Sequence, residues 1–418
     1  MKRNIYIFTD NFPYGSAEKS FLLPEIGILQ ENYNIAIISG ARESERAKKE
    51  LETSLAPEIK VFHHSKEDVN GFEVCKYIFS FLLFNGTRQE IKNIFLSRKN
   101  IIGRVEKSLY FFARAKKFKD WLEKESIIDK NDKGVIYSYW YNHRVLGFQM
   151  MRKEYPYLKI LTRAHGYDLY KERREYSWQP YKTVMDTVLD KIIFISEHGL
   201  KYYLQNFNMN EHKMKKYEIC KIGVGAQRTC INHQRHVPFL LVSCSSVIPL
   251  KRVEMIIDAL AEINEFDVKW VHFGDGLKFD EVRKRAQLKL GDKKNIKYEF
   301  KGYMDNRQIL LYYAEEMPDC FITVSSTEGS PVSVQEALAF GTPMIGTAVG
   351  GIPEMINGNG ILLDGNPLIE NIVSAINEIV FLDDAKYYDM RKKSYQIWKE
   401  DYNQTENIKR FMEILDNL

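Results

Sequence analysis

Cysteine is scarce in this sequence, and its few cysteines form no recognisable pattern. They are odd in number, widely scattered and never spaced as Cys-x-x-Cys: Cys75, Cys220, Cys230, Cys244 and Cys320. This arrangement excludes a disulfide framework and a zinc module of the usual spacing. It is typical of a reducing compartment, and we therefore expect a cytoplasmic protein.

Long apolar runs and a strong net charge are also missing. The longest apolar run, residues 77–84 (YIFSFLLF), is far shorter than the roughly 20 residues that a membrane-spanning helix needs. The stretch NIYIFTD from Asn4 is too short for the core of a signal peptide and is better interpreted as a first strand. Lys and Arg number 60 against 56 Asp and Glu, and this near balance argues against nucleic acid as a partner.

The sequence does contain a regular alternation of short apolar runs and helix-like stretches. One series of runs begins at Asn4, Ile35, Lys60, Gly134, Lys159 and Lys191, and a second begins at Pro238, Val268, Ile296, Cys320 and Thr342. Such alternation is typical of βαβ units around a buried parallel sheet. A chain of 418 residues suits two domains. We predict an α/β fold of two doubly wound, Rossmann-like parallel-sheet domains that face a central cleft.

A polar stretch without pattern, residues 225–238 (GAQRTCINHQRHVP), separates the two series. We therefore expect an N-terminal domain over residues 1–226, a linker over 227–238 and a C-terminal domain over 239–393. The remaining residues, 394–418, carry apolar side chains at roughly helical spacing. This last segment could pack on either domain, including back on the N-terminal one.

One part of the N-terminal domain is lopsided in charge. Between Arg88 and Lys119, ten basic residues accompany only Glu90 and Glu106, and they are interleaved with Ile, Phe, Leu and Tyr. A basic amphipathic helix of this kind can lie on an anionic membrane surface. A solvated helix face over the core is an equally good interpretation of the pattern.

The most informative segment is residues 327–346 (TEGSPVSVQEALAFGTPMIG), which follows a predicted strand. Ser330 is a good N-cap and Pro331 fits the first helical position, so we expect a helix from here to near Gly341. The free amides of its first turn, residues 332–334, would then form an anion site suited to phosphate.

Two glutamates flank this expected helix start. Glu328 lies in the loop before it and Glu336 lies inside the helix, so a ligand lying across the helix start could meet both carboxylates. This placement argues against a tightly coupled acid/base pair. Carboxylates bind sugar or ribose hydroxyls well because a charged acceptor makes a strong hydrogen bond. On spacing alone, ordinary helix-surface charges remain the alternative.

The pattern as a whole resembles one protein family. Residues 328–356 show Glu-x7-Glu followed by Gly-x-Pro-x-Ile and Gly-Gly-x-x-Glu, which resembles the retaining glycosyltransferases of family 4 with the GT-B fold. Matching segments stand in the same order elsewhere: RAHGYDLY (163–170), FISEHG (194–199), VSCSSVIPLKRVEMIIDAL (242–260), HFGDG (272–276) and FKGYM (300–304). The resemblance covers nearly the whole chain and is nearest to bacterial enzymes of capsule, exopolysaccharide and lipopolysaccharide O-antigen assembly.

For the C-terminal domain, the resemblance implies a role for each matching residue. Glu336 would hold the ribose hydroxyls of a sugar nucleotide, and Glu328 would face the transferred sugar. Lys251 would neutralise the diphosphate leaving group, where a fixed cation helps most in the transition state. The other donor contacts implied are Gly274, Tyr303, Met304, Gly329, Ser330, Pro331, Val332 and Ser333.

The sequence departs from the family pattern at Ser246. The family usually carries an arginine here, five residues before Lys251, that also grips the diphosphate. Either Arg252 supplies the second positive charge, or the diphosphate is bound more weakly than usual, because a hydroxyl cannot replace a bidentate guanidinium.

In the N-terminal domain, the resemblance implies that His165 reaches the donor sugar, so that His165, Glu328 and Lys251 form the catalytic set. Asp168 either serves the sugar or holds its loop through local hydrogen bonds. Gly15 and Ser16 stand where the family has a glycine-rich loop near the donor phosphate or the acceptor, with Glu18 following. A structural role for His165 and an N-cap role for Ser16 are the alternatives.

The resemblance thus implies a retaining glycosyltransferase that moves a hexose or N-acetylhexosamine from a nucleotide diphosphate sugar, with UDP favoured. The acceptor would be a hydroxyl of a growing glycan or lipid-linked oligosaccharide, and the enzyme would be cytoplasmic or peripheral at the inner face of the cell membrane. Because no Asp-x-Asp occurs, we expect no metal and no cofactor, with amides and the helix dipole assisting Lys251. A sugar-nucleotide 2-epimerase and a non-catalytic sugar-nucleotide-binding partner are the alternatives, since a fold does not determine a function.

Overall fold

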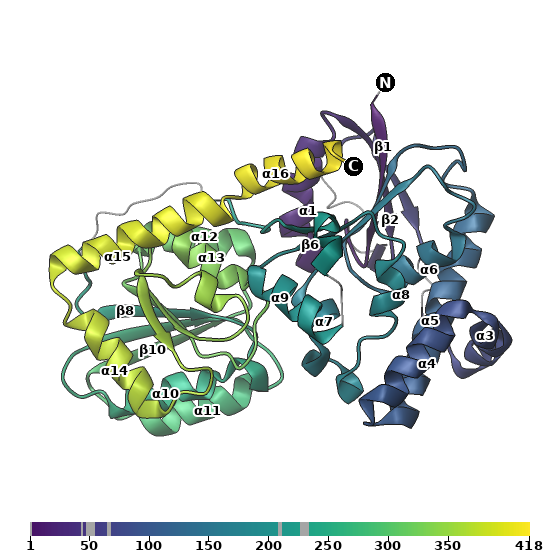
Figure 1. Ribbon diagram of the computed structural model, residues 1–418. Coiled ribbons are helices and arrows are strands. Elements are labelled where there is room, and N and C mark those ends of the chain that lie inside the picture. Colours follow the sequence, from purple (N-terminus) through teal and green to yellow (C-terminus); the bar gives the residue numbers. More distant parts are fainter. Residues whose placement is uncertain (1, 43–44, 47–54, 65–67, 208–210, 226–233) are drawn as a thin grey trace. The chain divides into compact units, whose positions relative to one another are not determined.

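The computed structural model describes residues 2–42, 45–46, 55–64, 68–207, 211–225 and 234–418. The chain forms two compact units (Figure 1). The first unit is Met1–Cys220 together with Ile408–Leu418, and the second is Lys221–Asn407. Of the predicted linker, only residues 234–238 lie within the described part.

The first unit is built on a parallel sheet that, among the described residues, has seven strands in the order β3-β2-β1-β4-β5-β6-β7. The strands are β1 (Arg3–Thr9), β2 (Tyr33–Ser39), β3 (Lys60–His63), β4 (Val135–Ser138), β5 (Lys159–Ala164), β6 (Lys191–Phe194) and β7 (Tyr217–Ile219). The first six lie in the apolar runs that predicted them, and β7 was not predicted. Because every pair is parallel, all carboxyl ends meet at one edge of the sheet.

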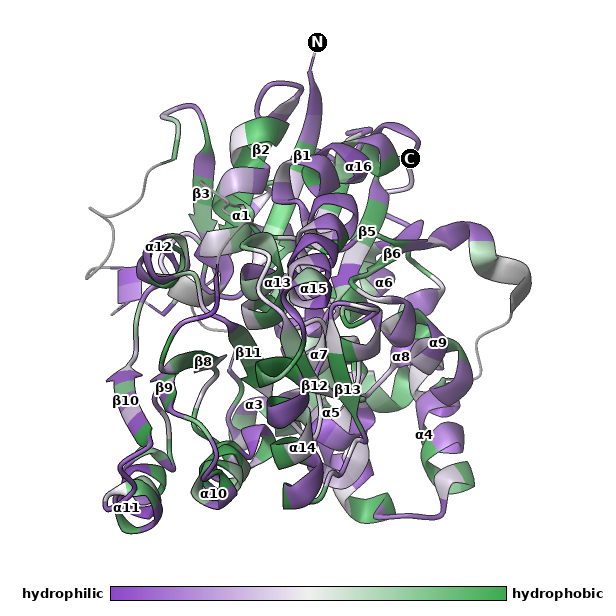
Figure 2. Cartoon of the chain, turned by 90° about the vertical axis from the view of Figure 1, so that its left-hand side faces the viewer, coloured by the Kyte–Doolittle hydropathy of each residue, from purple (hydrophilic) through white to green (hydrophobic). Residues whose placement is uncertain are grey.

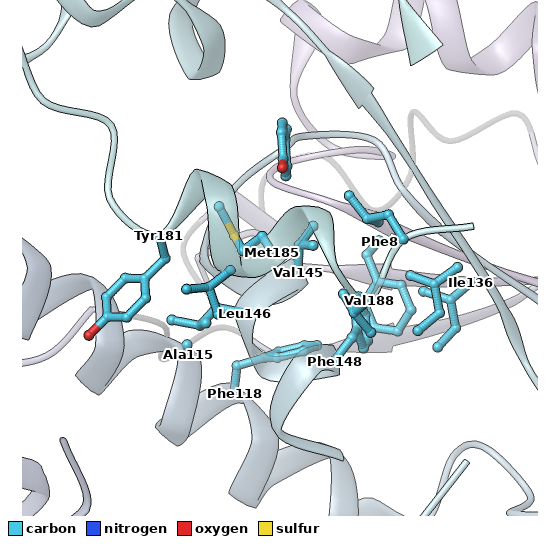
Figure 3. Packing of buried hydrophobic residues seen from close by; sticks show 14 of the residues in the cluster. Phe8, Ala115, Phe118, Ile136, Val145, Leu146, Phe148, Tyr181, Met185 and Val188 are labelled. Atoms are coloured by element: carbon cyan, nitrogen blue, oxygen red, sulfur yellow. The ribbon is translucent and has the colours of Figure 1, made fainter. Parts of the chain in front are cut away.

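Helices cover both faces of this sheet. They are α1 (Ser16–Leu29), α3 (Gly71–Leu83), α4 (Asn85–Ser97), α5 (Ile101–Glu125), α6 (His143–Met151), α7 (Gly166–Leu169), α8 (Lys182–Asp186) and α9 (Glu197–Asn206). Strand β1 shows why both faces are buried, since Ile5 and Ile7 belong to one apolar cluster while Tyr6 and Phe8 belong to another. In the second of these clusters the Phe8 ring lies 4.9 Å from the ring of Phe148 (Figure 3).

The last helix, α16 (Gln404–Asp416), completes the first unit. Its Phe411 and Leu415 are fully buried in the cluster that contains Ile5 and Ile7. The guanidinium of Arg163 on β5 lies 4.7 Å from the Phe411 ring. Helix α16 therefore contributes core side chains to a unit whose strands lie more than 180 residues earlier in the chain.

The second unit contains a six-stranded parallel sheet in the order β10-β9-β8-β11-β12-β13, again counted over the described residues. Its strands are β8 (Phe239–Cys244), β9 (Val268–Phe273), β10 (Ile296–Gly302), β11 (Cys320–Thr323), β12 (Met344–Thr347) and β13 (Gly360–Leu363). Five of them confirm predicted runs, and β13 was not predicted. In Figure 2 the central strands β8, β11 and β12 are mostly hydrophobic, while the edge strand β10 carries hydrophilic residues.

In the described part of this unit, six α-helices accompany the sheet. They are α10 (Val253–Glu262), α11 (Phe279–Leu290), α12 (Asn306–Glu316), α13 (Val332–Ala339), α14 (Ile369–Val380) and α15 (Asp384–Ile397). Along β8, Leu241 enters one apolar cluster while Leu240 and Val242 enter the other, so this sheet too is buried on both faces. Beyond α15, Trp398 and Tyr402 are buried in the second unit.

The basic residues between Arg88 and Lys119 lie in two different environments, the later ones paired or buried and the earlier ones exposed. In the second half of the segment, on α5, four lysines form ion pairs: Lys107 with Glu175, Lys116 with Asp120, Lys117 with Glu73 on α3, and Lys119 with Glu123. Arg104 is buried and donates to the Tyr176 carbonyl. In the first half, Arg88, Lys92, Arg98 and Lys99 are exposed. No helix in the described part of the chain is long and apolar enough to cross a bilayer.

Candidate functional site

The loop between β11 and α13 carries Glu328 and leads into the helix start that the sequence singled out. The helix begins at Val332, and its N-cap is Pro331, one residue later than predicted. The Ser330 hydroxyl accepts a hydrogen bond from the Gln335 side chain at 3.0 Å, and no side chain caps the helix at Pro331. The backbone amides of the first helical turn have no partner within the helix, so the expected anion site keeps its chemical basis.

The loop that contains Gly350 and Gly351 packs against the backbone of Glu328 and Gly329. The Gly351 amide donates to the Gly329 carbonyl at 2.8 Å, and a Cβ at Gly350 would lie only 1.8 Å from the Glu328 carbonyl oxygen. Gly350 also has a φ of 56°, which other residues rarely adopt. Gly350, the first glycine of the segment AVGGIPEM, is therefore required for the close approach of these two loops.

Lys251 and Glu328 are brought together by the fold. The Lys251 ammonium lies 2.5 Å from the Glu328 carboxylate, and both side chains are largely shielded from solvent. Lys251 ends a short 3-10 helix, Pro249–Lys251, whose Leu250 carbonyl accepts from the Ser326 amide. The sequence placed both residues at the donor but did not predict their ion pair.

Arg252 adopts a left-handed backbone conformation with a φ of 48° and turns its guanidinium onto neighbouring loops. It donates four hydrogen bonds, to the carbonyls of Val324, Ser325 and Gly365 and to the Asn366 side chain. Of its five N–H groups, one remains beyond these bonds. This geometry favours a structural role for Arg252, so a second cation for the diphosphate is not evident here.

Ser246 is exposed at the carboxyl end of β8, where its hydroxyl offers no charge. The loop around it is packed against the loop that follows β9. A Cβ at Gly274 would lie 2.0 Å from the Ser245 carbonyl oxygen, and one at Gly276 would lie 2.7 Å from that of Val247. Gly274 therefore permits a close contact between two backbones, which is sufficient to explain a glycine at this position.

Glu336 is buried on the second turn of α13 and has a partner that the sequence did not suggest. Asn306, the first residue of α12, donates a hydrogen bond from its side chain to one Glu336 oxygen. Burial raises the pKa of Glu336 to about 8, and the bond from Asn306 only partly opposes this rise. Asn306 follows a predicted strand and stands in the capping box that Asp305 and Gln308 form, a signal that could have drawn attention to it.

Two of the expected donor contacts, Tyr303 and Met304, lie just before α12. Gly302 ends β10 with a φ of 66°, Tyr303 is exposed, and Met304 packs against the cluster beneath α13. Because Asn306 contacts Glu336, this loop and the buried end of the candidate site are adjacent.

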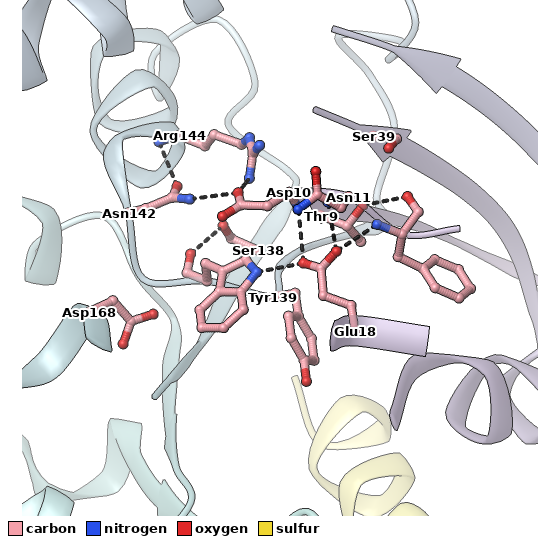
Figure 4. A network of polar contacts seen from close by, with 12 residues as sticks. Thr9, Asp10, Asn11, Glu18, Ser39, Ser138, Tyr139, Asn142, Arg144 and Asp168 are labelled. Atoms are coloured by element: carbon pink, nitrogen blue, oxygen red, sulfur yellow. Dashed lines mark hydrogen bonds and ion pairs between the residues drawn. The ribbon is translucent and has the colours of Figure 1, made fainter. Parts of the chain in front are cut away.

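In the first unit, the Glu18 carboxylate accepts hydrogen bonds from other groups of the protein (Figure 4). One carboxylate oxygen accepts from the amides of Asn11 and Phe12, and the other accepts from the Asp10 amide and the Trp140 indole. Burial raises its pKa even though these donors oppose the rise. Glu18 thus braces the loop after β1. In that loop Gly15 lies against Asn11, where a Cβ would be 2.5 Å from the Asn11 Cβ. Ser16 begins α1, and its side chain lies outside the described part.

His165 is buried at the carboxyl end of β5 and is held as a neutral imidazole. Burial, helped by the positive charge of Arg163, lowers its pKa to about 3. Its Nε2 lies 3.0 Å from the Tyr139 carbonyl oxygen, so this nitrogen carries the proton and Nδ1 is left as an acceptor. The ring lies 4.5 Å from that of Trp140. Such a histidine can accept a hydrogen bond from a hydroxyl group but is a poor proton donor at neutral pH.

Asp168 holds two loops together. Its carboxylate accepts from the His165 amide at 2.6 Å and from the Tyr141 amide at 2.8 Å. Burial raises its pKa to about 6, while the charge of Lys182 works against that rise. Of the two interpretations left open by the sequence, the loop-holding role is observed directly.

The structure therefore assembles the expected residues into two groups, one in each unit. In the second unit, Lys251 and Glu328 meet before α13, while Glu336 meets Asn306. In the first unit, Trp140 links Glu18 to His165, although the run from Gly134 that contains Trp140 had been interpreted only as a strand. No cluster of potential metal ligands occurs among the described residues.

This pair of parallel-sheet units is the GT-B fold. The apo lipopolysaccharide outer core galactosyltransferase WaaB superposes with a TM-score of 0.68 at 16% identity, covering 99% of this chain and all of that one. Anabaena Alr3699/HepE in complex with UDP-glucose gives a TM-score of 0.63 at 16% identity, again over 99% of this chain and all of that one. At such low identity the likeness shows the fold alone.

The second unit resembles a known family by sequence. Residues 231–397 match the family described as "Glycosyl transferases group 1". N-acetyl-alpha-D-glucosaminyl L-malate synthase of Bacillus anthracis is 35% identical over 122 residues, which are 28% of this chain and 29% of that protein. The GtfA subunit of the Streptococcus gordonii UDP-N-acetylglucosamine–peptide N-acetylglucosaminyltransferase is 26% identical over 235 residues, 53% of this chain and 44% of that protein. The matches thus span less than half the length of either relative.

Proposed function

We propose that this protein is a retaining glycosyltransferase that transfers a sugar from a UDP-sugar to a hydroxyl group of a growing, lipid-linked glycan. The observation that carries the proposal is the arrangement at the head of α13. The Lys251–Glu328 ion pair stands just before the free helix amides, and the buried Glu336 stands just behind them. A cation, a row of amides and a buried carboxylate suit the phosphates and the ribose of one extended nucleotide sugar.

The ion pair suggests how donor binding prepares the site. An incoming diphosphate competes with Glu328 for the Lys251 ammonium, and the released Glu328 carboxylate can then accept bonds from the sugar hydroxyls. Cleavage of the anomeric bond places negative charge on the β-phosphate, where Lys251 and the helix amides stabilise it. By the family resemblance, the acceptor attacks from the leaving-group face and gives its proton to the donor phosphate, so no protein nucleophile is required.

Two further roles follow for the remaining groups. We assign Glu336 to the ribose hydroxyls, with Asn306 fixing the orientation of its carboxyl group. By the family resemblance, we assign Nδ1 of His165 to a hydroxyl of the donor sugar, since a neutral imidazole can accept a hydrogen bond but does not add a positive charge. With Ser246 neutral and Arg252 engaged elsewhere, Lys251 is the main cation for the diphosphate.

The relatives suggest which donor to test first. Both curated relatives bear N-acetylglucosamine in their names, and the HepE structures contain UDP-glucose or UDP. We therefore propose UDP-N-acetylglucosamine as the first donor, followed by UDP-glucose and UDP-galactose. A lipid-linked acceptor remains part of the proposal because of the surface described in the next subsection.

The test measures UDP release from each donor with and without a lipid-linked oligosaccharide acceptor. Acceptor-dependent release, with an α-linked product by NMR, is expected for the wild-type protein and for Lys297→Ala, which alters an exposed lysine of β10. Lys251→Ala should be nearly inactive. A β-linked product would refute retention. Isomerised donor without acceptor would identify an epimerase, and tight binding of all three donors without turnover would identify a non-catalytic binding protein.

A further inference from the structure

We propose that α3, α4 and the start of α5 form a docking surface for an anionic lipid bilayer. The α3–α4 surface, as we call it, comprises the exposed side chains between Phe72 and Ile102. Both helices pack on α5 within the first unit (Figure 1), and the inference does not depend on the transferase activity.

The apolar half of the α3–α4 surface is unusually exposed. About a third of the large apolar side chains exposed in the described residues fall within 72–102, less than a tenth of the chain. They are Phe72, Ile78, Phe79, Leu82, Leu83, Phe95, Leu96 and Ile102, with exposures from 40% to 85%. Such a concentration of exposed apolar side chains marks a surface that binds a membrane or another molecule.

The helical spacing shows that these side chains form outward stripes. On α3, positions 72, 76, 79 and 83 follow one another at intervals of four, three and four, while Val74, Tyr77 and Phe81 are buried on the opposite side. On α4 the same intervals connect 88, 92, 95 and, just beyond the helix, 99, while Glu90 and Ile94 are buried. The first stripe is mainly apolar and the second mainly basic.

The charge of this surface identifies its partner. Between Gly71 and Gly103, every exposed charged side chain is basic, namely Lys76, Arg88, Lys92, Arg98 and Lys99. The acidic residues of this stretch are paired or buried: Glu73 pairs with Lys117, and Glu90 is buried against Ser108 and Trp178. Phenylalanine and leucine among lysine and arginine on helix faces is the combination that binds the interface of anionic membranes.

The rest of the basic segment does not belong to this surface. On the later part of α5, Lys107, Lys116 and Lys119 already have carboxylate partners in the protein. Their charges are largely neutralised and contribute little to attraction of an anionic lipid. The functional stretch therefore ends near Ile102 rather than at Lys119, and it includes the apolar α3, which charge alone did not indicate.

The experiment measures sedimentation of the full chain with vesicles of phosphatidylcholine, with and without phosphatidylglycerol. Binding is expected only to the anionic vesicles and should weaken as salt is raised. Lys92→Glu with Arg98→Glu should weaken it by at least about 25-fold, since each basic residue near the surface is worth roughly fivefold. The matched control is Lys284→Glu with Lys297→Glu, which makes the same charge change on exposed lysines of the second unit.

A second variant, Phe79→Ser with Leu83→Ser, tests the apolar stripe without altering charge. It should reduce vesicle binding while leaving the thermal midpoint unchanged, because both side chains are exposed. Equal binding by the charge variant and its control would overturn the proposal, as would failure of the wild-type chain to bind anionic vesicles. A concentration-dependent dimer that these serines abolish, without vesicle binding, would instead assign the surface to a second copy of the chain.

Discussion

Binding of a UDP-sugar should release a proton from Glu336. Because burial raises its pKa to about 8, the carboxyl group of the unliganded protein is protonated in about nine molecules of ten at pH 7. Two ribose hydroxyls that donate to the carboxylate would stabilise its charged form, so its pKa in the complex should fall towards the ordinary value of 4.5. Close to one proton should therefore leave for each donor bound at pH 7.

Calorimetry measures this release directly. UDP-N-acetylglucosamine is titrated into the protein in two buffers of different ionisation enthalpy, and the difference between the observed heats gives the number of protons. This donor is suitable because its diphosphate is esterified at both ends and carries no proton near neutral pH. Since protonation competes with the donor, affinity should rise up to about tenfold per pH unit between pH 5 and 8 and level off above pH 8.

The variant Glu336→Gln separates this cause from others. Glutamine resembles the protonated carboxyl group, so the variant should bind the donor with low affinity, no proton release and no pH slope. The control Glu370→Gln changes an exposed residue of α14 and should behave as the wild type does. Equal heats in the two buffers despite clear binding, or a pH slope that survives in Glu336→Gln, would refute the assignment of Glu336 to the ribose.

Three further predictions concern the same unit, and a fourth concerns metal. Lys251→Ala should lower kcat by about 10² to 10³ because one fixed transition-state partner is lost, and steady-state UDP release checks this against Lys297→Ala. Arg252→Lys should lower the free energy of unfolding by at least about 2 kcal/mol, because lysine cannot reproduce four hydrogen bonds; an unchanged urea midpoint would contradict this. Gly302→Ala should cost about 1 kcal/mol through its positive φ alone, whereas Gly274→Ala should cost several times more, since its Cβ would meet a carbonyl oxygen at 2.0 Å, and comparison of thermal midpoints decides. Turnover in a chelator should equal turnover with Mg²⁺, and a loss that Mg²⁺ restores would refute the expectation of no metal.

The repeating elements could be predicted from sequence because their burial leaves a strong pattern. Strands such as β1 and β8 are covered on both faces, which produces continuous apolar runs. Strands β7 and β13 were not predicted, and each buries only one of its residues, so neither has the continuous burial of β1 and β8. The helix start was missed by one residue, since Pro331 has an extended backbone and is itself the N-cap, while the Ser330 hydroxyl bonds to Gln335.

The candidate site was harder to predict, because its contacts join loops that lie far apart in the chain. The Lys251–Glu328 pair spans 77 residues, and the bond between Trp140 and Glu18 spans 122. Local spacing carries no information about such meetings. The sequence likewise could not show that Arg252 takes a left-handed conformation and uses its guanidinium on neighbouring carbonyls.

The return of the chain to its first unit at Ile408 has a consequence for biosynthesis. The second unit, Lys221–Asn407, is one continuous stretch and can fold as soon as it has left the ribosome. The first unit cannot complete its core until α16 follows, because Phe411 covers the buried pair of Arg163 and Glu25, whose charged groups lie 3.0 Å apart. The unit that is synthesised first is therefore the one that completes its folding last. One face of its sheet stays uncovered until the eleven residues Ile408–Leu418 have been made.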